Sequence, residues 1–185
     1  MVKIYDITRE LLSAEVYPGD TAPRLKQVAV ESEGGFNTSD ITACLHNGTH
    51  LDAPLHVSQK ECGVDGVPLE KCFGRCVVVT VDGKVTLNKV VELSKLGAKK
   101  ILFRNAEITP TAAFELSFLK LDLVGTEQSS IGGKNVHASF LKHGTVVLEG
   151  LDLSTVKDGE YTLCALPLKI SGADGSPVRA VLIEE

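Results

Sequence analysis

The segment from His46 to His56 places three imidazoles and one carboxylate within eleven residues. Neutral imidazole and ionised carboxylate are the usual protein ligands of borderline divalent cations such as zinc and manganese. Gly48 and Pro54 disfavour a helix interior, so we expect the segment to be extended or turned. In an extended chain, residues of the same parity point to one side. The candidate ligands share that parity: His46, His50, Asp52 and His56.

The same segment cannot be a straight strand if its side chains are to converge. His50 and Asp52 would stand about 6–7 Å apart, close enough to reach one metal cluster. His46 would lie about 13 Å away, so the chain must fold back, and Asn47-Gly48 turns easily. The alternative is three unrelated histidines in a turn-rich loop. Even spacing of four potential ligands around a turn glycine favours a metal-binding bend.

Length and composition limit the class of protein. A chain of 185 residues fits one domain, residues 1–185, and 43% hydrophobic with 23% charged residues is typical of a globular protein. A net charge of −5 without a basic stripe argues against nucleic-acid binding. No apolar run approaches the roughly 18 residues of a membrane span. The N-terminus lacks a signal-peptide pattern, and the five cysteines form no Cys-x-x-Cys pair, so we expect reduced thiols in the cytoplasm.

Strand and helix patterns alternate in the middle of the chain, and both ends are rich in strand patterns. This order predicts an α/β fold: a single mixed-sheet domain, parallel in the middle and antiparallel at the ends. The expected helices are Leu87–Leu96, Thr111–Phe118 and Val136–His143. The expected strands are Lys3–Thr8, Gln27–Glu33, Ile41–Leu45, Cys76–Val81, Ile101–Arg104, Leu121–Val124, Thr145–Leu148, Tyr161–Leu166 and Val178–Ile183.

Further ligands must come from elsewhere in the chain, where only two histidines remain. His143 precedes Gly144 at an expected helix C-terminus, and capping is its first interpretation. His137 follows a Ser/Gly-rich loop that could border a pocket. Glu149 ends an apolar run and is either an ordinary strand-end acid or a ligand at the strand tip. The residues alone leave the roles of His137 and Glu149 open.

The sequence resembles a known family at these positions. The segment from His46 to His56 matches the His-x-Gly-Thr-His-x-Asp-x-Pro-x-His pattern of the cyclase-like metal-dependent hydrolases, whose best-known members are bacterial kynurenine formamidases. The resemblance covers nearly the whole chain and implies a swivelling β/α/β fold. It continues through Tyr17-Pro18-Gly19-Asp20-Thr21, His137, Leu148–Leu151, Ala165–Leu168 and Asp174–Ala180.

The resemblance also implies a set of metal ligands. In family members with two divalent ions, zinc or manganese, the positions of His46, His50 and Asp52 hold the first ion. Asp52 also bridges to the second ion, which the positions of His137 and Glu149 complete, and the position of Glu149 touches both ions. The ligand bend inferred from residue spacing agrees with this assignment.

Two further positions acquire roles from the resemblance. His56 matches the residue that donates and accepts protons, and in an extended chain it would lie about 13 Å beyond Asp52, beside the metals. Tyr17 matches an aromatic residue, often tryptophan, that contacts substrate. This chain has no tryptophan, and its 125–130 loop departs from the Gly-Ile-Asp-Thr-Pro-Ser of formamidases.

The leading functional hypothesis is hydrolysis of an aryl formamide such as N-formylkynurenine, giving kynurenine and formate, by metal-activated water. A cyclic amide or lactone, such as isatin or a dienelactone, is the alternative substrate for the same metals. A non-catalytic metal-dependent binding protein is the non-enzyme alternative. A serine hydrolase is disfavoured because the chain has no Gly-x-Ser-x-Gly motif. Besides a small-molecule substrate, we expect partner subunits in a homodimer or homotetramer.

Overall fold

The computed structural model describes residues 1–31 and 34–184. The four α-helices of this part of the chain are α1 Leu69–Cys72, α2 Leu87–Ser94, α3 Pro110–Ser117 and α4 Lys134–Leu141. The strands are β1 Lys3–Asp6, β2 Arg24–Ala29, β3 Thr38–Thr42, β4 His50–Asp52, β5 Phe73–Lys84, β6 Lys100–Glu107, β7 Leu123–Thr126, β8 Val146–Glu149, β9 Gly159–Cys164, β10 Gly175–Pro177 and β11 Val181–Glu184.

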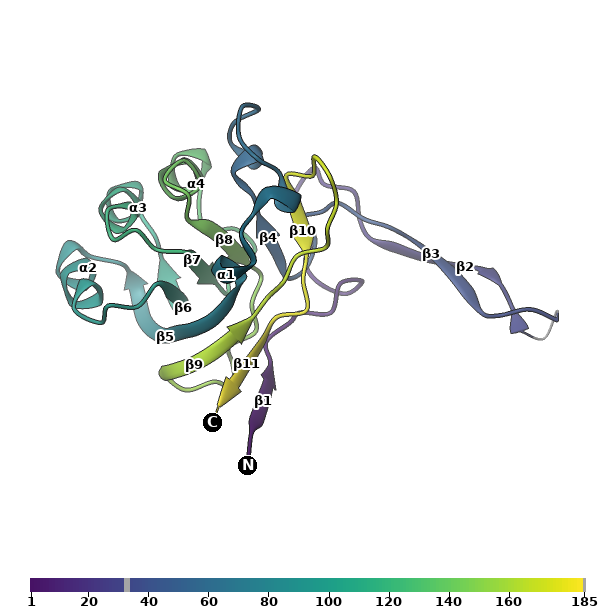
Figure 1. Ribbon diagram of the computed structural model, residues 1–185, viewed down its shortest axis with the longest axis horizontal. Helices are drawn as coiled ribbons and strands as arrows, with labels where there is room; N and C mark the ends of the chain where they lie inside the picture. The colour runs from purple at the N-terminus through teal and green to yellow at the C-terminus, as the bar shows by residue number, and fades with distance from the viewer. Residues whose placement is uncertain (32–33, 185) are drawn as a thin grey trace.

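Nine of these strands form one curled mixed sheet (Figure 1). Its order is β1-β11-β9-β5-β6-β7-β8-β4-β10. Strands β5, β6, β7 and β8 are parallel, whereas β4 and β10 at one end and β9, β11 and β1 at the other pair antiparallel. The predicted mixed α/β fold, with a parallel middle and antiparallel ends, is confirmed.

Helices α2, α3 and α4 connect the parallel strands and lie along one face of the sheet (Figure 1). Thr86 and Thr109 begin α2 and α3, and each hydroxyl accepts a hydrogen bond from a first-turn backbone N–H. Pro110 follows Thr109 at a position where a missing N–H costs nothing. All three helices were expected near these positions from the sequence, and the caps explain where α2 and α3 begin.

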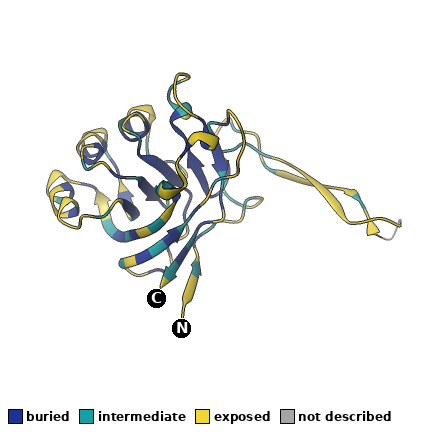
Figure 2. Cartoon of the chain, viewed as in Figure 1, coloured by how far each residue is buried: buried dark blue, intermediate teal, exposed yellow. Residues whose placement is uncertain are grey.

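The sheet separates two hydrophobic clusters because neighbouring residues of a strand point to opposite faces. In β6, Phe103 packs with the helices, including Leu116 and Phe140. The adjacent Leu102 belongs to the other cluster, with Leu51 of β4. Figure 2 shows the buried residues concentrated in the sheet and on the inner sides of the helices. This packing holds β8 and β4 rigidly, side by side.

Strands β2 and β3 form a hairpin that projects far from the sheet and is largely exposed (Figures 1 and 2). The strand expected at Gln27–Glu33 corresponds to β2, which begins earlier, at Arg24, and ends at Ala29. Residues 32–33 of the expected strand lie outside the described residues. The strand expected at Ile41–Leu45 corresponds to β3, which also begins earlier, at Thr38, and ends at Thr42. Neither strand buries a face, so the apolar alternation that normally fixes strand limits gives little information here.

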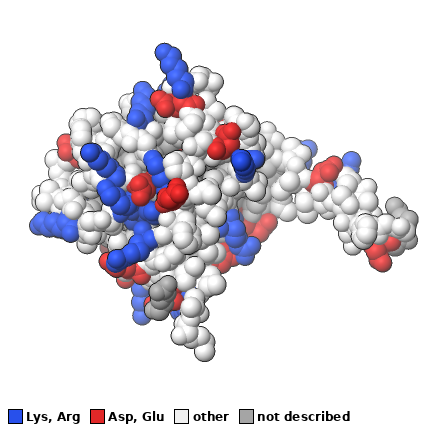
Figure 3. Space-filling view, viewed as in Figure 1, with Lys and Arg blue, Asp and Glu red and all other residues white. Residues whose placement is uncertain are grey.

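The surface carries charges of both signs. On the face shown in Figure 3, lysine and arginine side chains are interspersed with aspartate and glutamate. Among residues 1–31 and 34–184, no helix combines the length and the apolar character required to cross a membrane.

Candidate metal centre

Strand β4 carries two candidate ligands on one side of the sheet. His50 and Asp52 are both buried and share this side, while Leu51 between them enters the hydrophobic core. Antiparallel pairing with β8 places Glu149 directly opposite His50. Nε2 of His50 consequently lies 3.2 Å from Oε2 of Glu149 and 3.5 Å from Oδ1 of Asp52. Pairing of β4 with β8, which are far apart in the sequence, thus brings two acids and one imidazole together in a buried group.

His46 joins this group through the turn predicted at Asn47-Gly48. Gly48 has a φ of +64°, a left-handed conformation that favours glycine. The side chain of Asn47 accepts a hydrogen bond from the backbone N–H of Cys44, which stabilises the turn. Nδ1 of His46 lies 2.9 Å from Oδ1 of Asp52. The predicted bend is therefore confirmed.

Helix α4 supplies another imidazole, that of His137, to the same group of acids and imidazoles. His137 is buried, and its Nε2 lies 3.1 Å from Oε1 of Glu149 and 3.4 Å from Oδ2 of Asp52. The backbone N–H of Ile131, in the loop before α4, donates a hydrogen bond to the same Glu149 oxygen. The structure therefore brings together the five residues expected as ligands: His46, His50, Asp52, His137 and Glu149.

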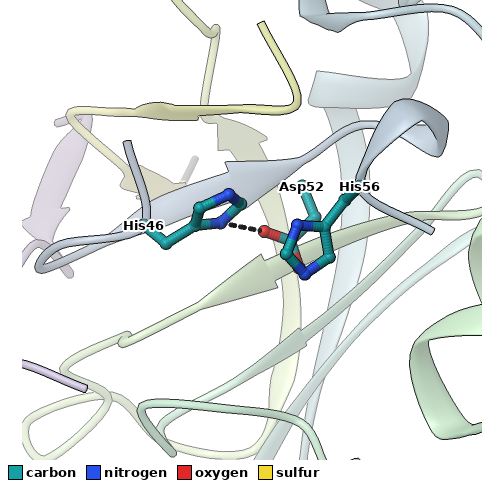
Figure 4. Close-up of side chains that lie close together, drawn as sticks. All are labelled: His46, Asp52 and His56. Carbon is teal, nitrogen blue, oxygen red and sulfur yellow. Dashed lines mark hydrogen bonds and ion pairs between the residues drawn. The ribbon is translucent and has the colours of Figure 1, made fainter. Parts of the chain in front are cut away.

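His56 lies closer to the cluster than the sequence suggested. The expectation that the chain stays extended beyond Asp52 was wrong, because Pro54–His56 forms a 3₁₀ turn. Pro54 begins it, and its carbonyl accepts the backbone N–H of Val57. Potential ligand atoms of His46, Asp52 and His56 all lie within 4.8 Å of one another (Figure 4). His56 therefore borders the cluster directly.

The donor set fits a divalent cation. A second group with potential ligand atoms within 4.8 Å consists of His50, Asp52 and Glu149, so Asp52 belongs to both groups. Asp52 is fully buried, and its Oδ2 has no hydrogen-bond partner among the described residues. A buried carboxylate oxygen without a donor is costly, and a bound cation removes that cost. Imidazole with carboxylate suits zinc and manganese alike.

The pKa values of the cluster reveal how the metal-free protein balances its charges. Burial lowers the pKa of His46, but the hydrogen bonds and charges of Asp52 and, to a smaller extent, of Asp174 together outweigh burial and raise it to about 9. The same opposition, with Asp52 and Glu149 as partners, raises the pKa of His137 to about 10. Burial raises the pKa of both acids, but the neighbouring imidazoles hold each below its ordinary value. Without metal, protons on the imidazoles neutralise the carboxylates.

Metal binding is expected to release protons and to strengthen as the pH rises. A cation needs unprotonated imidazole. His46 and His137, with pKa values raised to about 9 and about 10, bind protons at pH 7 in the metal-free protein. Raising the pH toward these values removes the competing protons, so apparent affinity should increase from pH 6 to pH 8. Calorimetric zinc titrations in buffers of different ionisation enthalpy measure the protons released. Affinity independent of pH would contradict this expectation.

The cluster lines a pocket of about 420 Å³. Tyr17, expected to contact substrate, lies on its wall and is about half exposed. The loop that departs from the formamidase pattern contributes to the wall as well. Besides the imidazoles and Glu149, the pocket residues include Tyr17, Asp20, Val57, Ser129, Ser130 and Lys134. A small molecule in this pocket reaches both the cluster and His56.

Asp174, which was not expected among the site residues, lies beside the cluster. Its Oδ2 lies 3.2 Å from Nε2 of His46 and 3.3 Å from Nδ1 of His56. Burial raises the pKa of Asp174, but the hydrogen bond and charge of His46 lower it more, with a smaller contribution from His56. The Asp174-Gly175-Ser176-Pro177 motif was the available signal, yet its spacing alone indicates no contact with the histidines.

Because Gly175 has no β-carbon, the imidazole ring of His46 can lie directly against it. A β-carbon at this position would lie 2.5 Å from Cε1 of His46, so Gly175→Ala must displace the ring from Asp52. We expect metal affinity to fall about 10–100-fold, the usual effect of disturbing a ligand's immediate support. Competition with a chromogenic chelator measures it. Gly35→Ala, whose β-carbon meets nothing within 4 Å, is the control. Equal affinities in the two variants would contradict the packing argument.

Comparisons with known proteins indicate the family of this chain. Residues 5–114 match the family described as "Putative cyclase". The chain is 34% identical to the kynurenine formamidase of Salinibacter ruber, over 97% of this chain and 96% of that protein. It is 25% identical to a solved structure described as a potential metal-dependent hydrolase with cyclase activity, covering 100% and 99% of the two chains with a TM-score of 0.86.

A more distant structural match shows how widely the fold is shared. Isatin hydrolase A from Labrenzia aggregata has a TM-score of 0.84 over 98% of this chain and 93% of that one, with 22% identity. At this identity the match shows the fold alone. The family match and the full-length relative, together with the buried imidazole–carboxylate cluster, identify the class of protein. The chain belongs to the putative cyclase family and is a metal-dependent hydrolase that uses a divalent cation.

Proposed function

We propose that this chain hydrolyses an aryl formamide, N-formylkynurenine, to kynurenine and formate. The observation that carries the proposal is the buried Oδ2 of Asp52, which has no hydrogen-bond partner among the described residues and lies 3.4 Å from Nε2 of His137, an imidazole that lines the pocket of about 420 Å³. The kynurenine formamidase of Salinibacter ruber, similar over nearly its whole length, supports the choice of substrate. A deeply buried carboxylate with an open coordination position and a pocket beside it are the requirements of metal-assisted hydrolysis.

We propose a pair of zinc or manganese ions for the cluster. His46, His50 and Asp52 would hold one ion, Asp52, His137 and Glu149 would hold the other, and Glu149 would touch both. The central position of Asp52, with one oxygen near His46 and His50 and the other near His137, supports its role as the bridge. Elemental analysis after purification without added metal tests both the identity and the stoichiometry.

His56 is the proposed proton donor and acceptor. The bound cations lower the pKa of water and polarise the substrate carbonyl. His56 borders the cluster and lines the pocket, so its imidazole can take a proton from the attacking water and return it to the leaving amine. Its side chain is about one-third exposed, which leaves the ring accessible to substrate.

Tyr17 is the proposed contact for the aromatic part of the substrate. Its ring lies on the pocket wall, and offset stacking on an aryl group would orient the formamide toward the cluster. A second candidate substrate is a cyclic amide such as isatin, or a lactone. The specific observation in its favour is the departure from the formamidase pattern at Tyr17 and at Ser129, both of which form part of the wall.

A substrate panel on the metal-loaded protein separates these functions. We expect the highest kcat/KM for N-formylkynurenine, followed by absorbance of the kynurenine formed, and loss of turnover after chelation. Faster hydrolysis of isatin or a dienelactone would favour the second candidate. Absence of hydrolysis for every compound, with metal bound, would overturn the proposal and favour a binding protein.

We also propose that the protein is a homodimer or homotetramer in which the β2–β3 hairpin contacts another subunit. Leu25 and Ile41 are register partners across this hairpin, and both are more than half exposed. An isolated two-stranded hairpin is marginally stable, so a partner surface would support it. Light scattering after size exclusion should give a multiple of the subunit mass, reduced in Leu25→Lys. A monomeric mass for the unaltered protein would contradict this.

We infer a cytoplasmic location from the cysteines. All five are described, and none forms a disulfide. Reduced thiols are typical of a reducing compartment. Cell fractionation with a compartment marker tests the inference, and recovery in a secreted fraction would contradict it.

A further inference from the structure

The position of Asp174 is fixed by the sheet and not by a free loop. β10 pairs antiparallel with β4, with Gly175 opposite Asp52. The carbonyl of Asp174 accepts the backbone N–H of Ala53 at 2.9 Å, which extends the ladder by one bond. Asp174 is therefore held beside the point where the chain leaves β4 for the turn that carries His56.

From this anchored position, one carboxylate oxygen reaches two imidazoles. Oδ2 of Asp174 lies 3.3 Å from Nδ1 of His56 and 3.2 Å from Nε2 of His46. The distance to His56 is at the long end of the hydrogen-bond range, as is common for catalytic contacts before substrate binds. We propose that Asp174 is a positioning residue that accepts the Nδ1–H of His56 and thereby fixes its orientation and tautomer.

The tautomer matters for the chemistry assigned to His56. The hydrogen bond made by one ring nitrogen decides which nitrogen carries the proton. If Nδ1–H donates to Asp174, Nε2 is the unprotonated atom and is available in the pocket that His56 lines. Without Asp174, the ring loses this restraint and can present a protonated Nε2, which cannot accept a proton from water. The catalytic consequence rests on the proposed function, whereas the tautomer itself does not.

Asp174 also touches His46, so an action through the metal ligands is the competing explanation. Two features favour His56. The Nδ1 of His46 already lies 2.9 Å from Asp52, which orients that ring independently, and the missing β-carbon of Gly175 provides the space for it. Among the described residues, the contacts of the His56 ring nitrogens include one acid, Asp174. Loss of Asp174 should therefore affect His56 more than His46.

The first experiment measures the tautomer without using activity. Full-length protein loaded with zinc and labelled with ¹⁵N in histidine is studied by long-range proton–nitrogen correlation, which distinguishes the two neutral tautomers of each imidazole. We expect an Nδ1–H pattern for His56 that shifts toward Nε2–H in Asp174→Ala. Asp65→Ala is the matched control, because Asp65 accepts the backbone N–H of Gly172 in the same loop without contacting His56. Its spectrum should keep the Nδ1–H pattern.

The second experiment is a double-mutant cycle on turnover, with zinc content measured for each variant. Asp174→Ala should lower kcat, with little change in KM and with zinc retained. The decrease in kcat should not exceed that expected for loss of the acid/base itself, which is about 10²–10⁴-fold. In a His56→Ala background the same substitution should have no further effect.

The outcomes separate the positioning role from the proposed function. An Nε2–H pattern in the unaltered protein, an unchanged pattern in Asp174→Ala, or the same change in Asp65→Ala would overturn the positioning role. Loss of zinc from Asp174→Ala, or an equal effect on kcat in both backgrounds, would also overturn it, because Asp174 would then act through His46 or the loop. If the unaltered protein hydrolyses no substrate, the proposed function fails, and the tautomer still decides the role of Asp174.

Discussion

His56→Ala is expected to lower kcat about 10²–10⁴-fold, the usual contribution of a general acid–base, while the metal content stays unchanged. The imidazole lies beside the cluster on the wall of the pocket, whereas the buried acids and the three imidazoles of the cluster, those of His46, His50 and His137, remain in place. Steady-state kinetics with N-formylkynurenine and elemental analysis of the same sample measure the two quantities.

A histidine outside the site provides the control for this substitution. His143 follows α4, and its Nδ1 lies 2.8 Å from the carbonyl oxygen of Ser139. His143→Ala removes an imidazole without touching the pocket and should leave kcat unchanged. Loss of metal from His56→Ala would contradict the division of labour, because it would make His56 a ligand.

Asp52→Asn is expected to abolish turnover and to weaken metal binding by more than the about 10–100-fold typical of changes outside the ligand shell. The amide keeps the shape of the side chain but removes the charge shared by both groups of ligand atoms. It also places an N–H₂ group at a position where three imidazole nitrogens, those of His46, His50 and His137, lie within 3.5 Å of the carboxylate oxygens. Chelator competition and metal analysis give the affinity.

Asp122→Asn is the matched control for Asp52→Asn. Asp122 pairs with Lys100 at 3.4 Å, away from the pocket, so its neutralisation should leave metal content and kcat intact. Full metal occupancy in Asp52→Asn would contradict the bridging role. Equal metal loss in Asp52→Asn and His56→Ala would show that the two residues do not have separate functions.

The parts of the fold that bury a face were predictable from the sequence. Helical apolar spacing located α2, Pro110 located the start of α3, and the β-branched run that begins at Cys76 located β5. The two strands of the projecting hairpin were predicted several residues too late in the sequence, because they bury no side chains against the sheet. The limits of a strand can be predicted when one face is buried and apolar residues alternate with polar ones. The hairpin is largely exposed and lacks this signal.

The site was predictable only where its geometry is local. The turn at Gly48 and the shared side of His50 and Asp52 follow from glycine conformation and strand alternation. The contact of Asp174 with His56 depends on the β4–β10 register, which no short motif specifies. His56 was placed too far away because Pro54 was interpreted as a barrier to helix and not as the start of a 3₁₀ turn.

The pairing of β4 with β8 has a consequence for the cell as well as for the enzyme. Residues 99 positions apart in the chain, His50 and Glu149, become neighbours only when this ladder has formed. A newly made polypeptide therefore offers no high-affinity coordination sphere, and the ions bind the finished fold alone. Each captured ion shifts the folding equilibrium toward that fold by mass action. Nutritional scarcity of the ion would consequently lower the steady-state abundance of the protein, and not merely its turnover.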